Sequence, residues 1–281
     1  MSGTKSQTPS AASETSLMAV YIRAMESRRP DALIRDEKAV ALVAERSEEF
    51  ARFAQVPMSD ALKVMRNLAT REYDRQARDF LARHADAVLV HVGTGLDSRF
   101  ERVDNGRVEW YDLDLPEVIG LRQKLFGDEG KRHHLLGCSV LEEAWMDALS
   151  AHNQRPFLFL AEVVLVYFDG AQLKRLVLAL REHFPGAELV FDACSPLHVW
   201  VANHQTSTSM LNARLQWGIR HGQEMEEWGG GVRLLDEWGF FDPPEPRLAH
   251  LRWLRPLEAA IRTSRIYHLR LGAAAEGKDR R

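Results

Sequence analysis

A glycine-containing turn and a later aspartate are the residues of this chain best suited to chemistry. The apolar run 87–92 is followed at once by Gly93 and Gly95. Because glycine has no side chain, such a turn lets the backbone approach a ligand closely. Asp114 ends a second short run 19 positions after Gly95, where a carboxylate can hydrogen-bond the hydroxyls of a ribose. The spacing therefore predicts a site for a nucleoside-containing cofactor.

The residues after the second glycine indicate which cofactor this is. Dinucleotide-binding turns usually read GxGxxG, but Ser98 occupies the last glycine position here and Asp97 precedes it. A carboxylate at this place repels a pyrophosphate, whereas it is tolerated beside a cationic, phosphate-free cofactor such as S-adenosylmethionine. A nicotinamide-dependent oxidoreductase is therefore kept only as an alternative.

The pattern around this turn predicts a doubly wound α/β fold. Predicted strands at 87–92, 108–111, 133–136, 156–160 and 187–192 alternate with amphipathic helices, which is typical of a mostly parallel sheet covered on both faces. A last strand at 265–271 is expected to complete the sheet edge. Ligands of such sheets lie at the carboxyl ends of the strands. We therefore expect one cleft to hold Gly93, Gly95, Asp114, Ser139 and Glu162.

The rest of the chain is expected to cover this cleft. Residues 1–14 are rich in small and polar types and predict a loose tail. Helical periodicity from Ser16 to His84 predicts an N-terminal helical cap, residues 15–84, of a single domain that spans 15–281. Residues 196–238 are expected to form a mostly helical, aromatic-rich insertion that serves as a substrate lid.

Composition excludes several function classes. Lys and Arg number 37 against 40 Asp and Glu, and the net charge of −3 argues against a nucleic-acid binder. The two cysteines, Cys138 and Cys194, predict neither a disulfide framework nor a metal site. No apolar run is long enough for a membrane span and no signal-peptide core is present. We expect a soluble, cytoplasmic enzyme without a metal; its oligomeric state stays open.

Three segments resemble one known family. Residues 92–99 (VGTGLDSR), 112–119 (DLDLPEVI) and 161–168 (AEVVLVYF) are similar to motifs of the leucine carboxyl methyltransferase family, which includes a tetracenomycin-type polyketide O-methyltransferase branch. The similarity extends over about residues 19–272. It implies a Rossmann-like, class I methyltransferase fold that uses S-adenosylmethionine and releases S-adenosylhomocysteine.

The resemblance also implies roles for individual residues. The backbone at the two glycines would pass under the cofactor, and Asp114 would hold the ribose hydroxyls. An arginine suits a carboxylate because its planar guanidinium can bind both oxygens. The remaining implied contacts are Ser139 and Val140 near the adenine, Glu162 beside the methionyl amine and Arg71 on the methionyl carboxylate.

Two positions depart from the family pattern. The family often has an acidic residue where Ser139 stands, and it usually has glycine after the glutamate, where this chain has Val163. The first departure concerns contacts to the adenine. The second concerns the shape of the cleft floor.

The expected reaction needs little help from side chains. A sulfonium methyl group is already activated, so catalysis consists mostly of alignment and exclusion of water. A carboxylate acceptor needs no base, whereas a phenol or an alcohol benefits from one. The candidates for contact with the acceptor are Tyr167, His204 and His221.

We expect an O-methyltransferase whose acceptor is a small molecule, such as a polyketide or a related natural product. The aromatic-rich insertion suggests this acceptor class. The carboxyl group of a protein or peptide C-terminus is the alternative acceptor, and a non-catalytic protein that binds S-adenosylmethionine is the alternative of another class.

Overall fold

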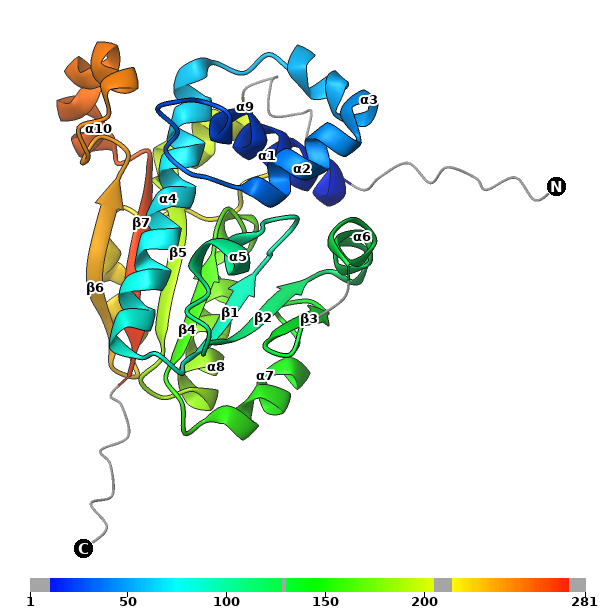
Figure 1. Ribbon diagram of the computed structural model, residues 1–281. Helices are drawn as coiled ribbons and strands as arrows, with labels where there is room; N and C mark the ends of the chain where they lie inside the picture. Colours follow the sequence, from blue (N-terminus) through cyan, green and yellow to red (C-terminus); the bar gives the residue numbers. More distant parts are fainter. Residues whose placement is uncertain (1–10, 128–129, 205–213, 273–281) are drawn as a thin grey trace, which may run out of the picture.

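A seven-stranded sheet forms the centre of the protein (Figure 1). The computed structural model describes residues 11–127, 130–204 and 214–272. The strand order is β3-β2-β1-β4-β5-β7-β6. β7 pairs antiparallel with both β5 and β6, whereas the other described strand pairs are parallel. The strands are β1 (Val88–Val92), β2 (Glu109–Asp114), β3 (His133–Gly137), β4 (Phe157–Ala161), β5 (Glu188–Cys194), β6 (Val232–Gly239) and β7 (Ser264–Leu271).

Helices cover both faces of the sheet, as the alternation of segments predicts. Leu89, Leu158 and Val190 point to one face and pack against α4 (Asp60–Arg83) and α5 (Arg99–Val103). Neighbouring strand residues point the other way, and there they pack against α7 (Ala144–Leu149) and α8 (Gly170–His183). Short 3-10 turns follow α7 and β4 at η2 (Ser150–His152) and η3 (Leu165–Tyr167). The doubly wound architecture is therefore confirmed.

Local sequence signals account for where the helices begin. The Ser59 hydroxyl accepts a hydrogen bond from the Leu62 N–H and starts α4. Asp169 and Gln172 form a capping box at the start of α8. A proline occupies the first position of α6 (Pro116–Phe126), where its missing N–H costs no helical hydrogen bond.

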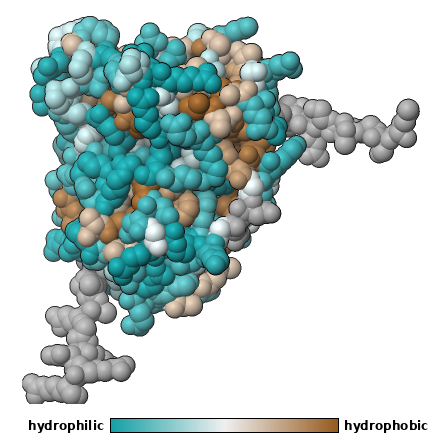
Figure 2. Space-filling view, viewed as in Figure 1, coloured by the Kyte–Doolittle hydropathy of each residue, from teal (hydrophilic) through white to brown (hydrophobic). Residues whose placement is uncertain are grey.

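The N-terminal helices form a cap over the carboxyl ends of the strands (Figure 1). They are α1 (Ala11–Ser27), α2 (Glu37–Glu45), α3 (Ser47–Phe50) and η1 (Ala51–Gln55). The cap has its own apolar cluster, to which Leu96 of the glycine turn contributes. Figure 2 shows apolar residues in patches over these helices and also lower on the same face, among mostly hydrophilic surface. The predicted tail 1–14 ends too late, because α1 begins at Ala11; residues 1–10 lie outside the described part.

The C-terminal third differs most from expectation. The strand predicted at the sheet edge is β7, which lies between β5 and β6, so that β6 forms the edge. Residues 232–238 therefore belong to the sheet and not to an inserted lid. The expected mostly helical character is also wrong for residues 214–221, which are irregular, while 205–213 lie outside the described residues. The remaining elements are α9 (Pro196–His204), η5 (Gly222–Trp228), η6 (Pro246–Leu254) and α10 (Arg255–Ile261).

Candidate functional site

The candidate site lies along the row of residues that follows the last paired positions of the parallel strands. Val92 pairs with Leu113 on one side and with Ala161 on the other. The same row continues to β3 and β5 through the pairs Leu113–Leu136 and Ala161–Phe191. The next residue of each strand or of the loop after it therefore lies at the carboxyl edge. These residues are Gly93, Asp114, Gly137, Glu162 and Asp192.

The two glycines of the turn are required by backbone conformation and by space. Gly93 and Gly95 have φ angles of +63° and +54°, which residues with side chains rarely adopt. A Cβ on Gly93 would lie 2.1 Å from Cγ2 of Val164. A Cβ on Gly95 would lie 2.8 Å from the hydroxyl oxygen of Ser16 in α1. The turn is thus enclosed by the loop after β4 and by the N-terminal cap.

Asp114 holds the turn in place from the end of β2. Its carboxylate accepts hydrogen bonds from the N–H of Gly95 at 2.7 Å and from the N–H of Leu115 at 2.7 Å. Burial raises the pKa of Asp114, and these two hydrogen bonds oppose the rise. The carboxylate both braces the glycine turn and lines the cavity beside it.

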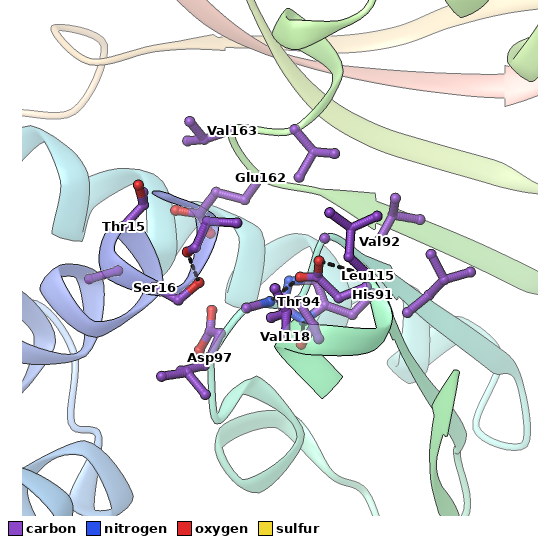
Figure 3. Close-up of a pocket in the computed structure, with 18 of the residues that line it drawn as sticks. Thr15, Ser16, His91, Val92, Thr94, Asp97, Leu115, Val118, Glu162 and Val163 are labelled. Carbon is purple, nitrogen blue, oxygen red and sulfur yellow. Dashed lines mark hydrogen bonds between the residues drawn. The ribbon is translucent and has the colours of Figure 1, made fainter. Parts of the chain in front are cut away.

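A cavity of about 410 Å³ lies above the carboxyl edge, within the size range of small-molecule sites (Figure 3). The turn between β1 and α5 and the loop after β4 form its floor, and α1 covers it with Thr15 and Ser16. Seven of the ten residues singled out from the sequence line it: Gly93, Gly95, Asp114, Ser139, Val140, Glu162 and Tyr167.

The other three residues do not line this cavity. Arg71 lines a second cavity between α2, α4 and α5, on another side of α4. His204 ends α9, where its Nδ1 lies 2.7 Å from the carbonyl oxygen of Trp200. His221 is exposed and precedes η5. The position of a residue in a helix or an insertion does not show which way its side chain points. The sequence alone therefore could not place these three side chains.

Arg66 lies on the same helix as Arg71 but faces the candidate site. It lines the main cavity, and its buried Nε has no hydrogen-bond partner among the described residues. Arg66 lies four residues before Thr70, so both share one face of α4, while Arg71 is turned about 100° from Thr70. Thr70 donates a hydrogen bond to Glu162 at 3.2 Å, which identifies that face as the one toward the site. The sequence alone carries no signal for this choice, because the contact between Thr70 and Glu162 forms only in the folded protein.

Asp192 and Tyr73 do not line the cavity, but they hold the loop that carries Glu162 and Val163, and the sequence analysis missed them. The Tyr73 hydroxyl is fully buried and lies 3.0 Å from both Asp192 Oδ1 and the carbonyl oxygen of Ala161. Burial raises the pKa of Asp192 to about 6, although the N–H of Val163 donates to the carboxylate. Asp192 is the last residue of the predicted strand 187–192. The rule that selected acidic residues at strand ends, applied to every strand, would have found it.

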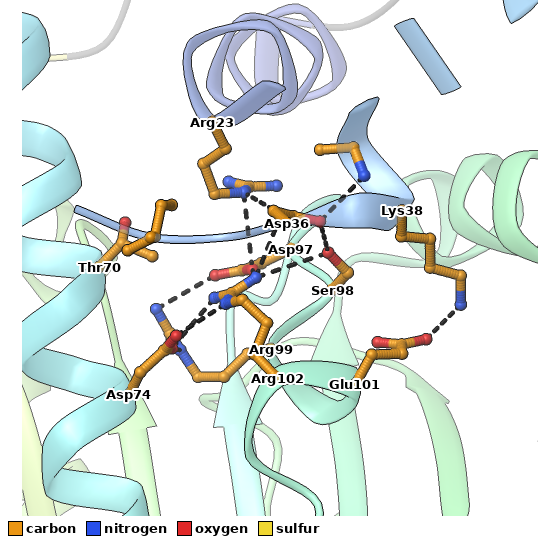
Figure 4. A network of polar contacts seen from close by, with 12 residues as sticks. Arg23, Asp36, Lys38, Thr70, Asp74, Asp97, Ser98, Arg99, Glu101 and Arg102 are labelled. Atoms are coloured by element: carbon orange, nitrogen blue, oxygen red, sulfur yellow. Dashed lines mark hydrogen bonds and ion pairs between the residues drawn. The ribbon is translucent and has the colours of Figure 1, made fainter. Parts of the chain in front are cut away.

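A buried network of ion pairs joins the glycine turn to the helices around it (Figure 4). Arg99 is fully buried and contacts Asp74 at 2.8 Å, Asp97 at 3.1 Å and Glu162 at 2.5 Å. Arg102 contacts Asp74 at 2.7 Å and Asp97 at 2.8 Å. Burial alone would raise the pKa of Asp97, but the guanidinium groups of Arg102, Arg23 and Arg99 hold it well below its usual value.

The same network attaches the cap to the turn. Arg23 of α1 donates to Asp36 at 2.8 Å and to the carbonyl oxygen of Leu96 at 2.7 Å. Asp36 also accepts from the Ala39 N–H, which caps α2, and from the Ser98 hydroxyl at 2.5 Å. Ser98, at the position of a third glycine, thus anchors the cap through its side chain. The network positions α1 over the cavity and Glu162 beside it.

The described residues contain no cluster of three or more His, Cys, Asp and Glu side chains that could hold a metal ion. None of the helices in the described ranges has the length and apolar character needed to span a membrane.

Burial raises the pKa of Tyr167, and Arg66 opposes this rise. The phenol is therefore protonated at neutral pH and available as a hydrogen-bond donor.

Comparisons with known proteins agree with this geometry. A family model for leucine carboxyl methyltransferase matches residues 16–180. The tetracenomycin polyketide synthesis O-methyltransferase TcmP of Streptomyces glaucescens is 32% identical over 82% of this chain and 84% of its own length. The S-adenosyl-L-methionine-dependent methyltransferase dpfgK of Gibberella zeae is 24% identical over 86% of this chain and 87% of its own.

Two solved structures share the fold. A DUF574 family protein from Streptomyces avermitilis superposes with a TM-score of 0.58 at 14% identity, covering 92% of this chain and 99% of its own. A protein from Thermobifida fusca gives 0.54 at 16% identity, covering 91% of this chain and 94% of its own. At these identities the likeness concerns the fold alone.

Proposed function

This chain belongs to the leucine carboxyl methyltransferase family, and we propose that it methylates an oxygen atom of a small molecule of the polyketide type. It is an S-adenosylmethionine-dependent methyltransferase with the Rossmann-like fold of the class I enzymes. One observation supports the finer proposal: a single cavity has Asp114 on one side of β1 and Arg66 and Tyr167 on the other. Donor and acceptor can therefore meet in one enclosed space.

The residues of the cavity fit the cofactor. The glycine turn leaves space that a Cβ would fill, and Asp114 offers carboxylate oxygens for ribose hydroxyls. Ser139 and Val140 are proposed to contact the adenine, and Glu162 is proposed to hold the amino group. Arg66, with its unpartnered buried Nε, would hold the carboxylate group.

The protein's own contribution is binding, alignment and exclusion of water. When bound, S-adenosylmethionine supplies a methyl group that is already activated by the sulfonium charge. α1 covers the cavity, which removes water from the reacting groups. Arg99 holds the Glu162 carboxylate at 2.5 Å, so its orientation is set before any ligand arrives. Tyr167 is proposed to donate a hydrogen bond from its protonated hydroxyl to the acceptor.

Ligand binding by the purified chain tests the proposed function. We expect S-adenosylmethionine and S-adenosylhomocysteine to bind with micromolar affinity in calorimetry, and NADH not to bind. Transfer of labelled methyl groups to phenolic and carboxylic small molecules should follow. Tight NADH binding without adenosyl-ligand binding would contradict the assignment, and binding without transfer to any acceptor would favour the non-catalytic alternative.

Methylation of a protein or peptide C-terminus is the second candidate. The family's description favours it, because that description names a carboxyl group as the methyl acceptor. Incorporation of label into proteins of a cell extract, but not into small molecules, would support this candidate over the first.

Arg66 and Arg71 form a matched pair for testing the cofactor site. Arg66→Ala is expected to weaken S-adenosylhomocysteine binding by about tenfold or more, because a charge-assisted hydrogen bond contributes roughly 1.5–3 kcal/mol. Arg71→Ala removes the same side chain from the same helix but lies in the other cavity, so its affinity should stay within about twofold of the wild type, that is, within about 0.4 kcal/mol. Calorimetry on both variants measures this, and equal losses would disprove the assignment to Arg66.

A further inference from the structure

Val163 has an unusual backbone conformation for its residue type. Among the described residues, Val163 and Arg262 are the two non-glycine residues with a positive φ, and Val163 has φ +57°. A β-branched side chain is poorly tolerated there because its Cβ substituents crowd the backbone. Such conformations persist only where the surroundings impose them, and they gather at functional sites.

The surroundings of Val163 do impose this conformation. Its N–H donates a hydrogen bond to Asp192 Oδ1 at 2.5 Å. The same oxygen lies 3.0 Å from the buried hydroxyl of Tyr73, which also lies 3.0 Å from the carbonyl oxygen of Ala161. Groups from β5 and α4 thus hold the loop after β4. These hydrogen bonds require a left-handed backbone conformation at position 163, but they do not require the side chain of a valine.

The valine side chain has no packing role that explains its presence. It is 37% exposed, whereas its neighbour Val164 packs over Gly93 and against the core. Val163 instead lines the cavity beside Glu162, on the side of β1 opposite Asp114 (Figure 3). Tyr167, four residues later in the same loop region, and Arg66 of α4 also line this cavity. Its isopropyl group therefore occupies space where the proposed donor and acceptor would meet.

We propose that the Val163 side chain determines acceptor specificity by limiting the width of a planar acceptor beside the transferable methyl group. This inference rests on the proposed function and makes it more specific. The acceptor would be an aromatic hydroxyl compound that presents a narrow end to the site, and wider ring systems would collide with the isopropyl group. Glycine at this position would relieve the backbone strain but would remove this selection.

Two variants separate the size of the side chain from the strain of the backbone. Val163→Ala removes two methyl groups but keeps a Cβ at positive φ. Val163→Asn keeps most of the bulk, and asparagine tolerates the left-handed region better than valine does. We expect Val163→Asn to raise the melting temperature by about 2–4 °C, and Val163→Ala to change it less. Thermal unfolding also shows that both variants are folded.

The experiment measures binding of phenol, naphthol and anthracenol to protein saturated with S-adenosylhomocysteine, by calorimetry. Val163→Ala is expected to raise the affinity for anthracenol relative to phenol by about tenfold, as small changes of pocket volume do. Val163→Asn should keep the wild-type ratio. The affinity of each variant for S-adenosylhomocysteine is measured first, and each is then saturated with it, so that the ratio of acceptor affinities is compared at equal occupancy of the cofactor site.

Each outcome decides between distinct conclusions. If S-adenosylhomocysteine does not bind the wild type, the proposed function fails and the specificity role fails with it. If it binds but Val163→Ala gives no gain for the wider compound, the specificity role alone is disproved. An equal gain in Val163→Asn would also overturn it, because strain and not size would then control selection.

Discussion

Replacing Arg99 by methionine is expected to lower the free energy of unfolding by about 3–5 kcal/mol, the usual cost of removing one partner from a buried ion pair. The Arg99 side chain has no solvent exposure and contacts the carboxylates of Asp74, Asp97 and Glu162. Its Nη1 also lies 2.9 Å from His91 Nε2. Methionine fills similar space, so most of the loss comes from carboxylates left buried with less compensation.

Urea unfolding measures this loss, with Arg75→Met as the matched control. Arg75 lies on α4 and pairs with Glu72 at 2.5 Å and Asp79 at 2.7 Å, but its side chain is 48% exposed. The pair with Asp79, whose side chain is 57% exposed, is of the exposed kind that contributes about 0–1 kcal/mol, and the buried Glu72 keeps a hydrogen bond from Gln76 at 2.9 Å when Arg75 is removed. If the two variants lost equal stability, the buried network would not be what holds the cap and the turn together.

Replacing Asp114 by alanine is expected to weaken S-adenosylhomocysteine binding by roughly a hundredfold. Hydrogen bonds to a charged group contribute roughly 1.5–3 kcal/mol, and the variant loses both the proposed ribose contacts and the brace on Gly95. Calorimetry measures the affinity, and thermal unfolding shows whether the fold persists. Wild-type affinity in a folded Asp114→Ala variant would overturn the assignment of this carboxylate.

Glu117→Ala is the control for nearby charge. Glu117 is an exposed acid in the first turn of α6, three residues after Asp114, and does not line the cavity. Its loss changes the helix-terminal charge by the same amount, an effect worth about 0.3–1 kcal/mol. A loss of affinity in Asp114→Ala alone therefore reports on the Asp114 carboxylate, through its proposed ligand contacts and its brace on Gly95, and not on the charge near the start of α6.

The position of Arg66 shows the limit of assigning site residues by motif. A motif locates a helix near a site, but only packing against the sheet decides which face of that helix points inward. Each residue of a helix turns the side-chain direction by about 100°. Arg66 and Arg71, five residues apart, therefore point about 140° apart and line different cavities. The motif indicated the helix but not which of its arginines points into the main cavity. The chemistry expected of an arginine at the site is unchanged.

The sequence by itself determined the parts of this protein that depend on local pattern. Alternating apolar runs and helices predicted the parallel sheet, and the glycine turn with Asp114 at the end of the next strand predicted the cofactor side of the site. These features follow from sequence because strands and turns are encoded by neighbouring residues, and because parallel strands bring their carboxyl ends together. The family motifs lie on these same segments, 92–99, 112–119 and 161–168.

Only the tertiary structure decided the features that depend on residues far apart in the chain. β7 lies inside the sheet because it pairs with β5 and β6, a choice that no local pattern specifies. The charges of Arg23, Asp74 and Arg99 meet only after α1, α4 and the turn have packed. The backbone of Val163 takes its conformation from Asp192, 29 residues later. Such contacts are set by packing over the whole domain, which neither the periodicity nor the spacing of one segment can encode.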